Sequence, residues 1–148
     1  MKIFLGSDHN GFHLKEDMFA YLVKHGYEVQ DVGDKNLDPG DDFPEFAQEA
    51  AIKVLGEPDG EARAILLCGG GQGMAMAANR FHGIRASVVW DPFEAKMTRN
   101  DNDSNVLCIP SRILDEGDWK GIVETWLNTP FAAAPRYKRR NAQIDGLM

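Results

Sequence analysis

The alternation of short strand-like runs with segments of helical period constrains the fold of this chain more than any other feature. The helical segments carry apolar residues every three or four positions, as in the stretch that contains Leu14, Met18 and Leu22. Strands that alternate with helices in this way pair in parallel, and the helices cover both faces of the sheet. The expected strands are residues 2–5, 27–33, 64–67, 84–89 and 106–109, and the expected helices are residues 13–24, 44–54, 72–80, 91–99 and 118–127.

Composition limits the classes of protein that this chain can belong to. Its 148 residues are 43% hydrophobic, which fits a single domain spanning residues 1–148. We expect no membrane partner and a cytoplasmic location, because there is no apolar stretch of about 20 residues and no signal-peptide pattern. The net charge of −7 argues against a nucleic-acid partner. Cys68 and Cys108 have no metal-ligand spacing, so we expect two free thiols, with Cys108 in the core.

A glycine-rich turn joins the third expected strand to the next helix. The stretch reads LLCGGGQGMAMAANR over residues 66–80, with Cys68 directly before the glycines. Backbone N–H groups at such a turn bind an oxyanion or a phosphate. The turn is not a dinucleotide fingerprint, because it follows the third strand and the next strand ends in Trp90 rather than in an acidic residue. It also lacks the Lys-Ser or Lys-Thr of a P-loop. The turn therefore predicts a site for a small anion beside a group that can transfer a proton.

Other polar residues follow the remaining strands at the edge where an α/β sheet binds its ligands. Asp8 and His9 follow the first strand, Trp90 and Asp91 follow the fourth, and Ser111 and Arg112 follow the fifth. Each pair alone is common in turns, but together they indicate one site. The basic stretch PRYKRR at residues 135–140 is either a solvated tail or an anion clamp.

Six stretches of the sequence, in order, resemble the motifs of the ribose-5-phosphate isomerase type B and galactose-6-phosphate isomerase family. They read GSDHNGFHLK, DFPEFA, ILLCGGGQGMAMAANRFHGIRA, TRNDNDSNVL, IPSRIL and PRYKRRNAQI, and they span almost the whole chain. The resemblance implies a Rossmann-like three-layer α/β/α fold with a five-stranded parallel sheet. It also implies a homodimer or homotetramer with shared active sites, and no metal or cofactor. The implied reaction is aldose–ketose isomerisation of a sugar phosphate by proton transfer between C1 and C2.

The same resemblance assigns roles to individual residues. Cys68 matches the base that removes the C2 proton, and a helix N-terminus favours the thiolate form that this role requires. The other matches are to substrate-binding positions: Gly69, Gly70, Gly71, Gln72 and Gly73 at the enediolate oxygen, Asn102 on the enediolate side, Asp8 and His9 at the sugar hydroxyls and phosphate, and Arg112, Arg136 and Arg140 at the phosphate. Arg136 and Arg140 match a pair that often reaches into a neighbouring subunit.

Four positions depart from the family pattern. Asp101 stands where the family usually has the histidine proposed to open the sugar ring, and a free aspartate is already ionised at neutral pH. Gly70, Phe43 and Tyr137 replace a hydroxyl residue, a tyrosine and a histidine. Two readings follow: Asp101 opens the ring itself, or the substrate is acyclic, as a tetrose 4-phosphate is. A non-catalytic phosphosugar-binding protein is the alternative function, although phosphate binding alone needs no thiol at position 68.

Overall fold

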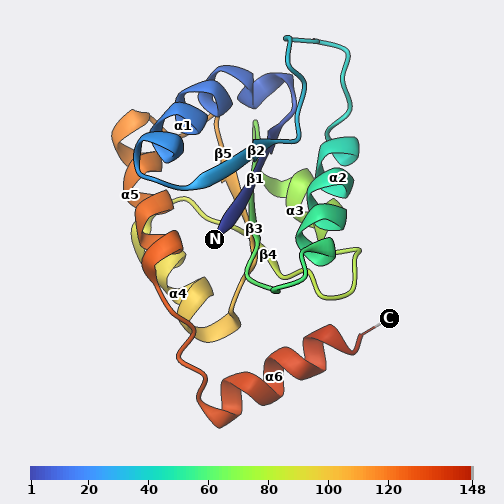
Figure 1. Ribbon diagram of the computed structural model, residues 1–148, viewed down its shortest axis with the longest axis vertical. Coiled ribbons are helices and arrows are strands. Elements are labelled where there is room, and N and C mark those ends of the chain that lie inside the picture. Colours follow the sequence, from blue (N-terminus) through green and yellow to red (C-terminus); the bar gives the residue numbers. More distant parts are fainter. Residues whose placement is uncertain (148) are drawn as a thin grey trace.

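The strand-like runs form one parallel sheet in the computed structural model, which describes residues 1–147 (Figure 1). The strands are β1 (Lys2–Ser7), β2 (Glu28–Asp31), β3 (Arg63–Cys68), β4 (Ala86–Val88) and β5 (Val106–Pro110). They lie in the order β2-β1-β3-β5-β4, and every neighbouring pair is parallel. The chain therefore winds outward in two directions from β1 and β3, which places the switch in strand order between these two strands.

Helices cover both faces of the sheet, and the alternation of side chains along each strand divides the core into two parts. Leu66 and Cys68 belong to the part under α2 and α3, whereas Ile65 and Leu67 belong to the part under α1, α4 and α5. Both faces of β3 are thus buried, as expected for a central parallel strand. The helices are α1 (Phe12–Lys24), α2 (Phe43–Gly56), α3 (Gln72–Ala78), α4 (Pro92–Asn102), α5 (Glu116–Asn128) and α6 (Pro135–Asp145), and a short 3-10 helix, η1 (His9–Gly11), precedes α1.

Local sequence signals set several of the helix ends. Gly26 follows α1 with φ +86°, a left-handed conformation that glycine adopts without strain, and so confirms the expected end of this helix. The Asp91 carboxylate accepts a hydrogen bond from the Glu94 N–H at 2.7 Å and caps α4. Asp115 and Asp118 cap each other's backbone at the start of α5.

The basic stretch at residues 135–140, expected to be either a solvated tail or an anion clamp, forms the exposed first part of a helix, α6. Pro135 occupies its first turn, where proline costs no hydrogen bond. Along the described part of α6, only Asn141 is buried, and Figure 1 shows the helix standing apart from the layered body. Its low apolar content explains why a search for core-facing apolar stripes did not identify it.

The fold class predicted from the sequence is confirmed as an α/β fold with a five-stranded parallel sheet between helical layers. Two differences from the predicted element boundaries affect the site. η1 begins at His9 rather than leaving it in a loop, and α4 continues beyond residue 99, so that Asp101 and Asn102 form its last turn. None of the helices in residues 1–147 is both long enough and apolar enough to cross a bilayer.

Candidate active site

The carboxyl ends of the three central strands are joined by backbone hydrogen bonds that continue beyond the sheet. The Asp8 N–H donates to the Leu67 carbonyl at 3.2 Å, and the Ser111 N–H donates to the Cys68 carbonyl at 2.9 Å. The Arg112 N–H then donates to the Gly69 carbonyl at 3.1 Å. These bonds bring Asp8, Cys68 and Arg112, which are far apart in the sequence, to one edge of the sheet.

Cys68 ends β3 with its sulfur held inside this edge. The side chain is buried, and its Sγ accepts a hydrogen bond from the Gly71 N–H at 3.0 Å. Gly71 has φ +72°, and a side chain there would also approach the backbone of Ile109 and Pro110 within 3.3–3.4 Å. Glycine is therefore required at position 71 to direct the N–H at the sulfur. A thiolate at Cys68 would accept the same N–H in a charge-assisted hydrogen bond.

The other glycines of this turn let side chains approach the backbone closely. A Cβ atom on Gly69 would lie 2.4 Å from Nη2 of Arg112, and one on Gly73 would lie 2.5 Å from the Phe43 ring. Within residues 1–147, the backbone N–H groups of Gly70, Gln72 and Gly73 are paired with no protein acceptor. A cationic side chain thus lies directly against a turn whose N–H groups can bind a negatively charged oxygen.

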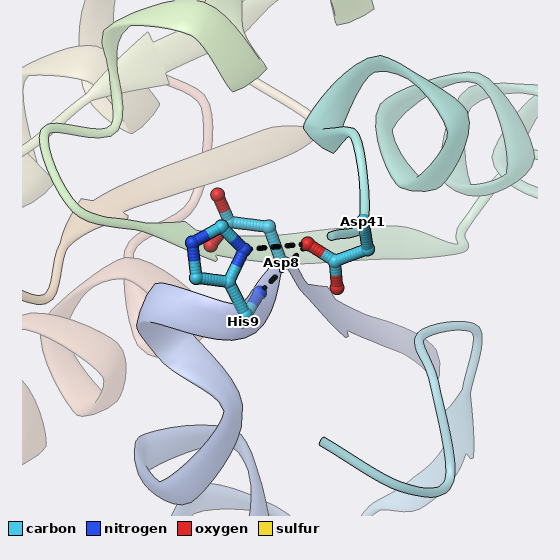
Figure 2. Close-up of side chains that lie close together, drawn as sticks. All are labelled: Asp8, His9 and Asp41. Carbon is cyan, nitrogen blue, oxygen red and sulfur yellow. Dashed lines mark hydrogen bonds and ion pairs between the residues drawn. The ribbon is translucent and has the colours of Figure 1, made fainter. Parts of the chain in front are cut away.

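His9 lies at the same edge and is hydrogen-bonded to Asp41, which the sequence motifs did not predict as a site residue. Its Nδ1 is 2.7 Å from Oδ1 of Asp41, and its backbone N–H donates to the same oxygen at 3.1 Å (Figure 2). This hydrogen bond raises the pKa of His9 above 6.5. Partial burial opposes the shift, while the charges of Asp8, Asp41 and Asp38 add to it. Asp8 is buried, and its carboxylate accepts from the Asn10 N–H at 3.0 Å.

Asp8, His9 and Asp41 also offer three ligand atoms within 4.8 Å of one another. Nδ1 of His9 is already hydrogen-bonded to Asp41. That bond accounts for the grouping without an ion, and we assign no metal to it. The expectation that the protein needs no metal or cofactor stays a prediction.

Four of the predicted site residues lie at the other end of the sheet. Asp101 and Asn102 end α4 just before β5 begins at Val106, whereas Cys68 pairs with Pro110 at the end of β5. Four residues of strand separate these levels by about 13 Å. Arg136 and Arg140 lie on α6, which contacts the same far end through an ion pair of 2.7 Å between Arg85 and Asp145. The chain therefore brings together Cys68, residues 69–73, Asp8, His9 and Arg112, but neither Asp101 and Asn102 nor the two arginines of α6.

A cavity of about 480 Å³ lies at this far end rather than beside Cys68. Asn102 and Arg85 line it from the body of the protein, and Ile144 and Leu147 line it from the C-terminal segment. The cavity and the Cys68 edge are thus two separate places on a single chain. Residues predicted to form one catalytic site lie at both places: Cys68 at the edge of the sheet and Asn102 at the cavity.

Comparison with known proteins identifies the family. The model of the family described as Ribose/Galactose Isomerase matches residues 3–144. Ribose-5-phosphate isomerase B of Escherichia coli (strain K12) is 41% identical over 142 residues, which cover 95% of this chain and 93% of that protein. The corresponding protein of Mycolicibacterium paratuberculosis is 35% identical over 140 residues, covering 95% of this chain and 87% of the other.

Solved structures agree with this assignment. The crystal structure of a ribose 5-phosphate isomerase from Thermotoga maritima superposes with a TM-score of 0.91 at 39% identity, covering 99% of this chain and 98% of that one. A ribose-5-phosphate isomerase B from Mycoplasma genitalium with bound ribulose-5-phosphate superposes with a TM-score of 0.92 at 35% identity, covering 97% and 93%. The shared fold and the near-complete match of the sequence lead to one conclusion: this chain belongs to the ribose/galactose isomerase family and is an aldose–ketose isomerase.

Proposed function

We propose that the protein interconverts an aldose phosphate and a ketose phosphate, with Cys68 as the base. The observation that carries this proposal is the buried Cys68 sulfur, which accepts the Gly71 N–H at 3.0 Å beside a turn with unpaired N–H groups. Binding a phosphate needs no thiol, whereas lifting a proton from carbon needs a base within reach of the substrate. The arrangement therefore favours catalysis over simple binding.

The proposed steps transfer one proton between adjacent carbons. The Cys68 thiolate takes the proton from C2 of the aldose, and the electrons of that C–H bond form the C1–C2 double bond. The C1 carbonyl oxygen takes the negative charge, which the N–H groups of Gly70, Gln72 and Gly73 would stabilise. The cysteine then returns the proton to C1 while the O2 proton passes to O1, which yields the ketose. No electrons leave the substrate, so the scheme needs no redox cofactor.

Arg112 is proposed to bind the phosphate, because its guanidinium lies against Gly69 at the entrance to the turn. Arg112→Ala should raise KM for the sugar phosphate roughly 10- to 100-fold, since each charge-assisted hydrogen bond to phosphate contributes about 1.5–3 kcal/mol. The change in kcat should be smaller. Steady-state kinetics with Arg139→Ala as the control, an exposed arginine with no role in the scheme, would measure both effects. Equal losses on phosphorylated and unphosphorylated sugars would contradict a phosphate role for Arg112.

A second copy of the chain is proposed to complete each site, in a homodimer or a homotetramer. Asn102, Arg136 and Arg140 resemble substrate-binding residues of the family, yet they lie about 13 Å or more along the strands from Cys68. α6 also stands away from its own sheet and exposes both arginines. A neighbouring chain can therefore receive them, together with Asp101, opposite its own Cys68.

A pentose 5-phosphate is the proposed substrate, with Asp101 as the group that opens the sugar ring. Support comes from the Mycoplasma genitalium relative, whose structure holds ribulose-5-phosphate. In this chain, Oδ1 of Asp101 accepts a hydrogen bond from the Asn100 side chain at 2.8 Å. An acyclic substrate such as a tetrose 4-phosphate is the second candidate, because an aspartate stands at the position of the family's ring-opening histidine.

Asp101→Asn distinguishes these substrates. We expect it to slow isomerisation of a pentose 5-phosphate by about 100-fold, in the range of general acid–base catalysis, and to leave a tetrose 4-phosphate unaffected. The tetrose cannot cyclise through an oxygen that carries its phosphate, so it needs no ring opening. Unchanged rates on both sugars would exclude a proton-transfer role for Asp101. A wild-type protein far faster on the tetrose would favour the acyclic substrate.

Solvent deuterium exchange tests the function itself. In D2O, the wild-type protein should incorporate deuterium at C2 of the aldose phosphate that it isomerises, because the thiol proton exchanges with solvent. NMR of a panel of tetrose, pentose and hexose phosphates would detect this exchange. Binding without exchange across the whole panel would instead identify a phosphosugar-binding protein.

A further inference from the structure

The loop between β2 and α2, residues 32–42, places the carboxylate of Asp41 against His9. The isomerisation scheme gives Asp41 no role. Oδ1 of Asp41 accepts both the backbone N–H of His9, at 3.1 Å, and Nδ1 of its ring, at 2.7 Å. The Asp41 side chain is 6% exposed, while the His9 side chain is 33% exposed. Oδ1 of Asp41 is therefore committed to His9, and His9 keeps part of its ring open to a ligand. Asp41 also shares a side-chain hydrogen bond with Asp34, and burial together with this bond raises the pKa of Asp34.

The position of this loop depends on a buried lysine. Lys15 of α1 is 2% exposed, and its Nζ lies 3.1 Å from Oδ2 of Asp31 and 2.5 Å from the carbonyl oxygen of Asp34. Its Nζ also lies 5.0 Å from the centre of the Phe12 ring. A buried ammonium group is stable only where it is paired in this way. Lys15 thus fixes the start of the loop that carries Asp41 near its other end.

The contact with Asp41 determines which nitrogen of His9 is available. An ionised carboxylate only accepts hydrogen bonds, so Nδ1 must carry a proton. Figure 2 shows the other ring nitrogen, Nε2, on the side of the ring away from Asp41. A proton on Nε2 makes the ring a cation that can donate to an anionic ligand.

We propose that Asp41 is a positioning residue for substrate phosphate, which holds His9 as an imidazolium with its Nε2–H directed at the anion. The inference rests on the proposed function, in which the phosphate binds beside Arg112, at the edge of the sheet where His9 also lies. It adds Asp41 as a residue that affects phosphate binding only through the orientation and charge of His9.

The charges around His9 support this protonation state. Asp8 from the end of β1 and Asp38 from the β2–α2 loop act in the same direction as Asp41, and the hydrogen bond to Asp41 raises the pKa of His9. Arg112 lies against the neighbouring glycine turn and supplies the other positive charge of the site. Phosphate binding should therefore be strongest below the raised pKa of His9 and should weaken as the pH rises through it.

Asp41→Asn tests the inference, because an amide oxygen can still accept the two hydrogen bonds but carries no charge. We expect the His9 pKa, followed by NMR of the ring protons, to fall towards 6.5. With inorganic phosphate as the probe, binding should weaken by up to about 10-fold relative to wild type at pH 7.5, where an imidazole of pKa 6.5 is protonated in only about one-tenth of the molecules. At pH 5.5, where His9 is protonated in both proteins, the difference should shrink to about 2-fold or less.

Asp42→Asn is the matched control, because it removes the same charge from the adjacent, exposed residue, whose side chain makes no capping bond. It should leave the His9 titration and phosphate affinity unchanged. A normal His9 titration in Asp41→Asn, or a loss of affinity that is the same at both pH values, would overturn the proposal. Asp41→Asn placed on His9→Gln should cause no further loss, and a further loss would also overturn it. These measurements need no turnover, so a failure of the proposed isomerase activity would be seen separately.

Discussion

Cys68→Ala is expected to reduce kcat for isomerisation by about 10²–10⁴-fold, the usual contribution of a general base. The thiol is the proton-transfer group closest to the glycine turn, because its sulfur accepts the Gly71 N–H. Removing it leaves Arg112 and the N–H groups of the turn in place. Affinity for the sugar phosphate should therefore survive while turnover and deuterium exchange at C2 disappear together.

Cys108→Ala is the matched control for this experiment. Cys108 is the second buried thiol. It lies on β5 opposite Leu66 of β3, in the same part of the core as Cys68. Burial raises the pKa of Cys108, so its thiol stays protonated and cannot serve as a base. The control should lose some stability through the cavity but keep kcat. Turnover of Cys68→Ala within a few-fold of wild type would show that another group removes the proton.

Mixing Cys68→Ala with Arg140→Ala is expected to restore about a quarter of wild-type activity, measured at a substrate concentration far below the raised KM of Arg140→Ala. If Cys68 and Arg140 act in one site but come from different chains, a dimer of Cys68→Ala with Arg140→Ala has one site with both lesions and one intact site. Random assembly of two chains makes half of the dimers mixed, which leaves about one intact site in four. We expect sites shared between two chains because, within one chain, α6 and Cys68 lie at opposite ends of the sheet.

A double variant with both lesions in one chain provides the opposite test. When Cys68→Ala/Arg140→Ala is mixed with wild type, each mixed dimer should have two damaged sites, so activity should fall below that expected from simple dilution. Sites built within one chain would reverse both results: the single variants would fail to complement each other, and the double variant would not inhibit wild type. Measuring both mixtures after refolding and exchange of subunits would decide between the arrangements.

The sequence by itself determined the layered fold and the position of Cys68, the proposed base. Strand and helix periods are local properties, and the burial of β3 on both faces follows from the apolar run RAILLC. The turn after β3 was equally readable, because Gly71 must adopt a positive φ that other residues disfavour. Parallel strands place their carboxyl ends at one edge, so Asp8, Cys68 and Arg112 were expected to meet there.

Only the tertiary structure revealed the partner of His9 and the separation of the remaining site residues. Asp41 reaches His9 through the path of an irregular loop held by Lys15, and no periodic pattern records such a path. The α6 helix has too few apolar residues to be identified from the sequence as a core helix, although it carries Arg136 and Arg140. Motif order along the chain likewise says nothing about which end of the sheet a residue occupies. That depends on the direction of each connection: α4 runs back to the start of β5 and carries Asp101 away from the Cys68 edge.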